Sequence, residues 1–321
     1  TYIEAGGGGG FAPYDQATLE WDADGGLTLY APSHNHGQGH ETAYAQIVAR
    51  VLGIPLESIR LKSSVPDRII TGNPTGGSRS LLGVGSVMLL AAREVVKKGL
   101  PLAAEELETA EADLEFGDGE YRVKGTDRRV ALAALAKKHP GRLDHDLTGQ
   151  KVGSTFPNGC HVSEVEIDPE TGEVAVLRYT AVDDAGTIVN HQIVEGQMQG
   201  GITQGAGHIL GEMAVYDAGT GQLLTGSFMD YPMPKAGWWG DQTIQLVDFP
   251  VPTATNPLGA KGVGEAGVTG SLPTVMNAIT DALRQAGVTR FDMPATPARV
   301  WAALQGAQAG KADAMAVAPL A

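Results

Sequence analysis

Residues 160–186 read CHVSEVEIDPETGEVAVLRYTAVDDAG, and this stretch decides the fold class. Apolar and polar side chains alternate through both halves, which is typical of strands with one buried face. Between the halves, residues 169–172 read Pro-Glu-Thr-Gly, a sequence typical of a tight turn. The stretch therefore predicts a β-hairpin.

Helical and strand patterns alternate on both sides of this hairpin. Downstream, residues 190–212 have helical spacing with many glycines, and residues 272–287 predict a helix whose N-cap is Ser271. Upstream, the patterns predict two strands around an Asp-Gly-Gly turn within 17–33, a helix at 41–53 capped by Gly53, and a strand at 58–64. A second helix ends at Lys97-Lys98-Gly99, and a further helix, hairpin and helix follow within 101–140. The predicted fold class is α+β, with two successive mixed α/β lobes at 1–150 and 151–305 and a mobile tail at 306–321.

The composition excludes several classes of protein. The 321 residues carry a formal net charge of −14, whereas a sequence-independent grip on nucleic acid needs a basic face. The single cysteine excludes a disulfide framework and an iron–sulfur cluster held by this chain alone. That residue, Cys160, lies in a strand pattern and is expected to be buried. No apolar run approaches the roughly 20 residues that a membrane span needs.

The first residues, TYIEAGGGGG, lack an initiator Met and the basic and apolar regions of a signal peptide. A strand-like segment runs directly into the chain. The sequence is therefore expected to be a fragment, a processed chain or one half of a split polypeptide.

Four glycine-rich segments, at residues 34–42, 73–80, 200–207 and 259–267, lie beside or within helical patterns. The strongest phosphate candidate is NPTGGSRS at 73–80, because a helix N-terminus with bare backbone N–H groups suits an anion. The segment supplies two glycines for close approach, an arginine for charge and three hydroxyl groups, those of Thr75, Ser78 and Ser80. An ordinary turn with a helix cap is the alternative reading.

The segment KGVGEAG at residues 261–267 contains the pattern Gly-x-Gly-x-x-Gly around a single glutamate, Glu265. A dinucleotide-binding loop follows a buried strand, and no strand pattern precedes this one. Flanking glycines would let a substrate reach Glu265, and a following helix N-terminus would favour its ionised form. These features predict a reacting group, with a solvated loop glutamate as the alternative.

Three histidines, His34, His36 and His40, have the His-x-His-x3-His spacing that some zinc hydrolases use. Two glycines interrupt the segment, and no carboxylate lies between the histidines. Loop histidines that hydrogen bond to the backbone or to a ligand are therefore favoured. A zinc-dependent hydrolase remains the alternative from another class.

Taken together, four motifs resemble the second molybdenum-cofactor-binding domain of the xanthine oxidase family, nearest to the branch of the bacterial carbon monoxide dehydrogenase large subunit. The resemblance extends from about Thr1 to Trp301. The motifs are HGQGHETAYAQIVARVLG at 36–53, PTGGSRS at 74–80, EGQMQGGITQGAG at 195–207 and NPLGAKGVGEAG at 256–267.

The resemblance implies a molybdopterin cofactor, in bacteria usually the cytosine dinucleotide, whose dithiolene rather than the protein holds molybdenum. It implies that Glu265 is the general base of a reaction that oxidises a C–H bond with water as the oxygen source. The implied cofactor contacts are Gly37, Gln38, Gly39, Thr75, Gly76, Gly77, Ser78, Arg79, Ser80, Gln204, Lys261 and Gly264.

The resemblance also implies that the chain is the C-terminal part of a catalytic subunit and acts only within a complex. The expected partners are a chain with the N-terminal half of the molybdenum site, a [2Fe–2S] subunit, an FAD subunit and a small-molecule substrate. The expected substrate is an aldehyde or N-heteroaromatic compound, with carbon monoxide as the alternative. A cytoplasmic location is expected, and the periplasm stays open.

Overall fold

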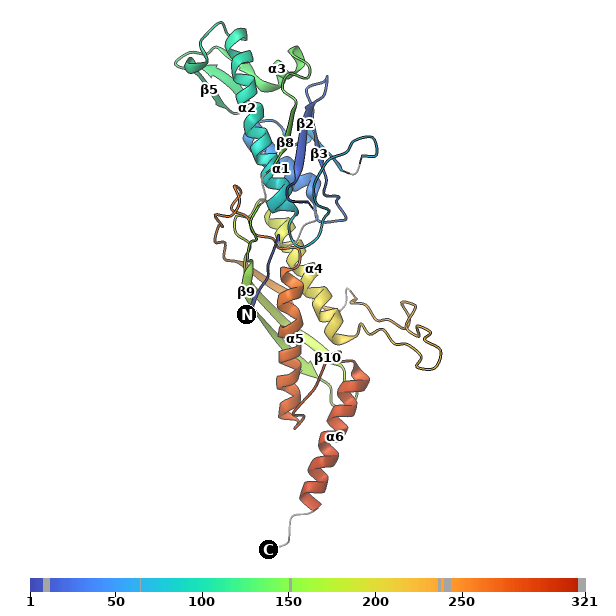
Figure 1. Cartoon of the computed structure of the whole chain (residues 1–321). Coiled ribbons are helices and arrows are strands. Elements are labelled where there is room, and N and C mark those ends of the chain that lie inside the picture. Colours follow the sequence, from blue (N-terminus) through green and yellow to red (C-terminus); the bar gives the residue numbers. More distant parts are fainter. Residues whose placement is uncertain (8–11, 64, 150–151, 236–237, 240–243, 317–321) are drawn as a thin grey trace.

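The computed structural model describes residues 1–7, 12–63, 65–149, 152–235, 238–239 and 244–316. Two lobes follow one another along an elongated molecule, and the N-terminus lies beside the second lobe (Figure 1). This arrangement confirms the predicted α+β class.

The first lobe is built on a four-stranded sheet of order β4-β3-β2-β8. Strand β2 is antiparallel to β3 and β8, and β3 is parallel to β4. Two helices, α1 and α2, pack against this sheet and share a core with it, and a smaller sheet, β5-β6-β7, lies at the outer end. The elements are β2 (Gln16–Trp21), β3 (Leu27–Ala31), α1 (His40–Leu52), η1 (Leu56–Ser58), β4 (Ile59–Ser63), η2 (Leu81–Gly85), α2 (Ser86–Glu106), η3 (Glu111–Asp113), β5 (Leu114–Gly117), β6 (Glu120–Val123), β7 (Arg129–Ala131), α3 (Leu132–Lys138) and β8 (His145–Thr148).

The second lobe contains a four-stranded sheet of order β1-β9-β10-β11, with α4 and α5 packed side by side along it. Its central pair, β9 and β10, is the predicted hairpin. Strand β1 pairs with β9, so the first residues lie with the second lobe, although the sequence assigns them to the first. The elements are β1 (Tyr2–Ile3), β9 (Asn158–Ile167), β10 (Val174–Asp184), α4 (His191–Leu210), β11 (Ile244–Asp248), α5 (Ala266–Gln285) and α6 (Pro297–Ala316).

Glycines allow α4 and α5 to approach with their backbones in contact. A Cβ atom at Gly201 would lie 2.9 Å from the Cα atom of Gly267, and one at Gly267 would lie 2.6 Å from the carbonyl oxygen of Met198. A Cβ atom at Gly205 would lie 2.0 Å from the Ser271 hydroxyl oxygen. No larger side chain fits at these positions, so the glycines of α4 serve the close packing that the sequence indicates.

Two helix ends differ from the prediction. Helix α2 continues past Gly99 to Glu106, and Gly99 packs against Tyr121, whose hydroxyl oxygen would lie 2.1 Å from a Cβ atom there. Helix α5 begins at Ala266, so Ser271 is a fully buried residue inside the helix rather than its N-cap. Both residues contact neighbouring elements, which local patterns do not reveal.

The prediction that Cys160 is buried is wrong: the side chain is exposed. Alternation along β9 turns His161 toward the helices and leaves Cys160 and Val162 on the opposite face of the sheet. Within the predicted tail, helix α6 extends to Ala316, and residues 317–321 lie outside the described part of the chain. The mobility of the tail stays a prediction.

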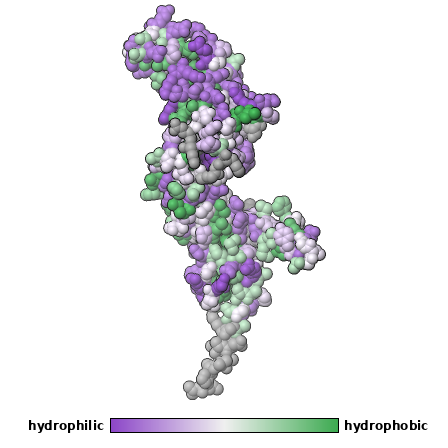
Figure 2. Space-filling view, viewed as in Figure 1, coloured by the Kyte–Doolittle hydropathy of each residue, from purple (hydrophilic) through white to green (hydrophobic). Residues whose placement is uncertain are grey.

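The surface of the two lobes differs in character. Hydrophilic residues dominate the face of the first lobe that Figure 2 shows. Between α4 and β11 an arm formed by residues 211–235 extends away from the second lobe (Figure 1), and Phe228 and Met229 on it are largely exposed. Among the described helices, none combines the length and apolar character that a membrane span requires.

Candidate functional site

A cavity of about 450 Å³ lies where loops of the first lobe meet loops and a helix of the second. This volume falls within the range of small-molecule sites, roughly 300–1,000 Å³. Its walls come from residues near the start of α1, from the 75–80 loop, from the start of α4 and from the 261–265 loop. The cavity therefore joins three of the four glycine-rich segments and the first turns of the helix that carries the fourth.

The 75–80 loop exposes its backbone to this cavity. At Gly76 no atom lies within 4 Å of where a Cβ atom would be, so the main chain is open to a ligand. Ser78 has a left-handed backbone conformation, with φ of 51°. The loop leads directly into η2, a π-helical turn that continues as α2, and helix N-termini present unpaired N–H groups. This geometry suits an anionic group such as phosphate.

Hydroxyl groups tie the loop to the first lobe. Thr75 donates to the carbonyl oxygen of His34 at 2.6 Å, and Ser80 donates to the Thr75 hydroxyl at 3.4 Å. The Tyr44 hydroxyl donates to the carbonyl oxygen of Ser80 at 3.2 Å. Sequence patterns do not single out Tyr44, because its role depends on a contact between α1 and a distant loop.

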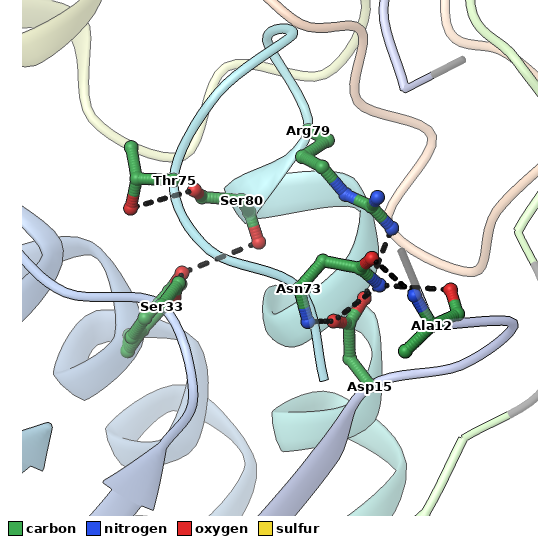
Figure 3. A network of polar contacts seen from close by, with 8 residues as sticks. Ala12, Asp15, Ser33, Asn73, Thr75, Arg79 and Ser80 are labelled. Atoms are coloured by element: carbon green, nitrogen blue, oxygen red, sulfur yellow. Dashed lines mark hydrogen bonds and ion pairs between the residues drawn. The ribbon is translucent and has the colours of Figure 1, made fainter. Parts of the chain in front are cut away.

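A buried carboxylate, Asp15, anchors the same loop from behind (Figure 3). It accepts hydrogen bonds from the backbone N–H of Asn73 at 2.8 Å and from the Asn73 side-chain amide at 3.1 Å. Its other oxygen lies 3.5 Å from the guanidinium of Arg79; the Asp15 side chain is 3% exposed and that of Arg79 12%. Arg79 borders the cavity, yet its charge is paired with Asp15. The arrangement makes Arg79 a support of the loop.

The Gln38 side chain folds back onto its own turn. Its carbonyl oxygen accepts from the His36 backbone N–H at 2.7 Å, and its amide donates to the carbonyl oxygen of His34 at 3.3 Å. Gly37 and Gln38 line the cavity. Gly39, with φ of 74°, is the N-cap of α1.

The three histidines do not form a metal site. The His34 and His36 rings lie 5.2 Å apart, whereas His40 is buried and stacks on Tyr44. Burial lowers the pKa of His40, so its ring is neutral near pH 7. Among the residues that the structure describes, no three potential ligands are arranged to hold a metal ion. The zinc hydrolase alternative is therefore not supported.

The 261–265 loop packs backbone to backbone against the 75–80 loop. A Cβ atom at Gly262 would lie 2.0 Å from the carbonyl oxygen of Ser78. The backbone N–H of Glu265 donates to the Ser78 hydroxyl oxygen at 2.9 Å. Glu265 itself is exposed, lines the cavity and immediately precedes α5. The two loops thus place a carboxylate at a helix N-terminus beside a phosphate-type loop.

Lys261 forms an ion pair with Asp184 at the base of this loop. Burial alone would raise the pKa of Asp184, but hydrogen bonds from Lys261 and from the backbone N–H groups of Val251 and Gly186 lower it overall. The Asp184 carboxylate is therefore ionised at neutral pH. Its position fixes Lys261 beside the cavity that it lines.

Helix α4 contributes its first two turns to the wall. Asn190 caps the helix by accepting from the Ile193 N–H at 3.0 Å, and Gln197 also lines the cavity. Gln204 lies exposed outside the lining, so its predicted cofactor contact stays untested. Gln197 precedes Gln204 by two helical turns on the same face, about 10 Å along the axis. That spacing is the signal by which Gln197 could have been found.

Most of the predicted site residues come together around the one cavity. Two of them, Gly39 and Gln204, lie outside its lining. Those that line it are Gly37, Gln38, Thr75, Gly76, Gly77, Ser78, Arg79, Ser80, Lys261, Gly264 and Glu265.

Comparison with known proteins identifies a family. Residues 1–238 match the model of a molybdopterin cofactor-binding domain. The chain is 36% identical to the carbon monoxide dehydrogenase large chain of Hydrogenophaga pseudoflava, over 92% of this chain and 38% of that one. It is 37% identical to the nicotine 6-hydroxylase large subunit of Paenarthrobacter nicotinovorans, over 91% of this chain and 37% of that subunit.

Solved structures agree with these matches. The crystal structure of a Cu,Mo-CO dehydrogenase superimposes with a TM-score of 0.86 at 31% identity, covering 96% of this chain and 40% of that one. Quinoline 2-oxidoreductase from Pseudomonas putida 86 superimposes with a TM-score of 0.84, also at 31% identity, covering 95% and 41%. The chain thus spans about two fifths of the length of these relatives.

Proposed function

The chain belongs to the molybdopterin cofactor-binding domain family of xanthine oxidase-type molybdenum hydroxylases, and from this premise we propose that it forms the C-terminal part of the catalytic subunit of a multi-chain molybdenum hydroxylase. The observation that carries the proposal is the cavity in which Glu265 lies beside the 75–80 loop. A phosphate-binding loop and an accessible carboxylate are the two parts of a molybdenum hydroxylase site that this chain would supply.

The residues present fit a molybdopterin. Glycines at several places in the cavity wall leave stretches of bare backbone, and the main chain at Gly76 faces open space. The backbone N–H groups of residues 75–80 would hold the phosphate, and Gln38 would face the pterin. When bound, the cofactor supplies Lewis acidity and accepts two electrons.

Glu265 would act as the general base. Its side chain is exposed to the cavity, and its backbone is held by the hydrogen bond to Ser78. Its carboxylate lies at the start of α5 and can accept a proton at Oε. The flanking Gly264 also lines the cavity and is exposed, so no side chain stands there between the cavity and Glu265.

We propose a C–H bond of an aldehyde or N-heteroaromatic compound as the site of oxidation, with water as the oxygen source. The similarity to nicotine 6-hydroxylase and quinoline 2-oxidoreductase supports this substrate class. The similarity to carbon monoxide dehydrogenase keeps carbon monoxide as the alternative.

The cofactor form and the partners are further parts of the proposal. The cofactor would be the cytosine dinucleotide of molybdopterin. The remaining part of the molybdenum site would come from protein outside this chain, because the relatives are more than twice as long. A [2Fe–2S] subunit and an FAD subunit would carry the electrons away, and the assembly would be cytoplasmic.

Elemental and nucleotide analysis of the purified complex tests the proposal. We expect one molybdenum, one cytosine and the two phosphorus atoms of the dinucleotide per copy of this chain, in addition to the two phosphorus atoms of each bound FAD. A double variant, His34→Ala with His36→Ala, should leave the metal content unchanged, because these rings form no metal site. A complex that contains zinc without molybdenum would overturn the assignment.

Gly76→Val separates cofactor binding from folding. The added side chain meets no protein atom within 4 Å of its Cβ position, so the melting temperature of the cofactor-free complex should not change. The same side chain would occupy cofactor space, and overpacking typically costs about 1–3 kcal/mol, which is roughly a tenfold to hundredfold loss of affinity. Molybdenum per chain after dialysis measures the effect. Full occupancy in this variant would mean that the cofactor does not contact the loop.

A further inference from the structure

Glu4, which immediately follows β1, carries a buried carboxyl group that the proposed reaction does not use. Its backbone N–H donates to the carbonyl oxygen of Pro157 at 2.9 Å. The residue is 8% exposed, and neither carboxyl oxygen has a partner with the geometry of a formed hydrogen bond. Burying a carboxyl group without partners is costly, so its presence here calls for a role.

The segment around Glu4 lies directly behind the two loops of the cavity. The Gly7 N–H donates to the carbonyl oxygen of Gly77 at 2.9 Å. A Cβ atom at Gly6 would lie 3.5 Å from the carbonyl oxygen of Ser78 and 3.6 Å from the Cα atom of Gly262. Glu4 does not line the cavity, so it faces the loops from the protein side.

Two side chains of the site act on this carboxyl group. Burial raises the pKa of Glu4, the Ser78 hydroxyl lowers it as a hydrogen-bond donor, and the negative charge of Glu265 raises it again. The Ser78 oxygen already accepts from the Glu265 N–H, so the hydroxyl proton of Ser78 remains to be donated. That proton and the buried Glu4 carboxyl group are a donor and an acceptor on the same side of the 75–80 loop.

We propose that Glu4 is a positioning residue that acts through Ser78: its carboxyl group accepts the Ser78 hydroxyl proton and thereby holds the Ser78 oxygen as the acceptor for the Glu265 backbone N–H. This inference rests on the proposed role of Glu265 as the base. Glu4, Ser78 and Glu265 thus form a chain of groups that runs from the protein interior to the cavity. This chain fixes the position of Glu265 at the start of α5. An apolar residue at position 4 would release the Ser78 hydroxyl to rotate.

Hydrogen–deuterium exchange of the loaded complex tests the link without measuring activity. In the wild type the Glu265 amide is held by Ser78 and should exchange slowly. Glu4→Leu should speed its exchange by about tenfold, the value of one hydrogen bond, whereas Glu4→Gln keeps the acceptor and should exchange like the wild type. Ser78→Ala should match Glu4→Leu, and the double variant should show no additional change. Glu57→Leu, an exposed glutamate of η1, is the matched control.

The rate of reduction by substrate, per bound molybdenum, is the second readout. We expect about a tenfold loss in Glu4→Leu and rescue to within about threefold of the wild type in Glu4→Gln. Wild-type exchange in Glu4→Leu would overturn the inference, and so would a Glu4→Gln variant as impaired as Glu4→Leu. If Glu4→Leu does not fold, Glu4→Met, which is also apolar and closer to glutamate in shape, carries the same test. Should Glu265 prove not to be the base, the exchange result would still decide the link between Glu4 and Ser78.

Discussion

Glu265→Gln should lower the rate at which substrate reduces the enzyme by roughly 10²–10⁴-fold, the usual cost of removing a positioned general base. Glutamine has the same shape and retains the backbone N–H that donates to Ser78 at 2.9 Å. It cannot accept a proton at neutral pH. The same side chain would also orient the substrate, so we expect a loss toward the upper end of this range.

The loss should appear in the reduction of molybdenum and not in later electron transfer. Stopped-flow reduction, normalised to molybdenum content, measures this step, and the content itself should stay near that of the wild type. Glu195→Gln is a matched control, because it makes the same change at an exposed position of α4 outside the cavity. Reduction of Glu265→Gln at more than about a tenth of the wild-type rate would be too fast for a lost base and would make the loop structural.

Asp15→Ala should destabilise the chain strongly and remove the cofactor with it. The substitution leaves the guanidinium of Arg79 buried without its partner, and breaking a buried ion pair in this way typically costs about 3–5 kcal/mol. It also removes the acceptor for two donors of Asn73. Because these contacts hold the 75–80 loop, the molybdenum content should fall together with the melting temperature.

A second substitution separates the two effects. In the double variant Asp15→Ala with Arg79→Met neither buried charge remains, so part of the lost stability should return. The cofactor content should stay low, because the Asn73 anchor is still missing. Asp24→Ala removes an exposed carboxylate of a surface pair and should leave both quantities unchanged. An unchanged melting temperature in Asp15→Ala would show that the network does not support the loop.

Local sequence patterns predict an element correctly where the interactions that determine it lie within the same segment. The hairpin of β9 and β10 follows from alternation and a turn, and Gly53 caps α1 with φ of 63° as predicted. Gly99 was misread as a helix end, because its reason for being glycine is Tyr121, on a different element. Ser271 has the sequence context of a helix N-cap, but it lies inside α5, where it packs against α4.

The same distinction between local and long-range interactions holds for the residues of the candidate site. Glycines and hydroxyl groups within one segment marked the 75–80 and 261–265 loops, and both line the cavity. Glu4 and Asp15 could not be found, since each belongs to the site only through contacts with residues far along the chain. The pairing of Arg79 with Asp15 was hidden for the same reason, so the sequence indicates a free phosphate ligand where the structure has an ion pair.

The direct contact between the α4 and α5 backbones at Gly201 and Gly267 also bears on how the enzyme could be redesigned. With no side chains between the two backbones, neither helix can shift to make room without separating from the other. The wall that holds Gln197 and the end of the helix that presents Glu265 therefore move as one body. Laboratory evolution toward bulkier substrates should accordingly accumulate its mutations away from this helix pair.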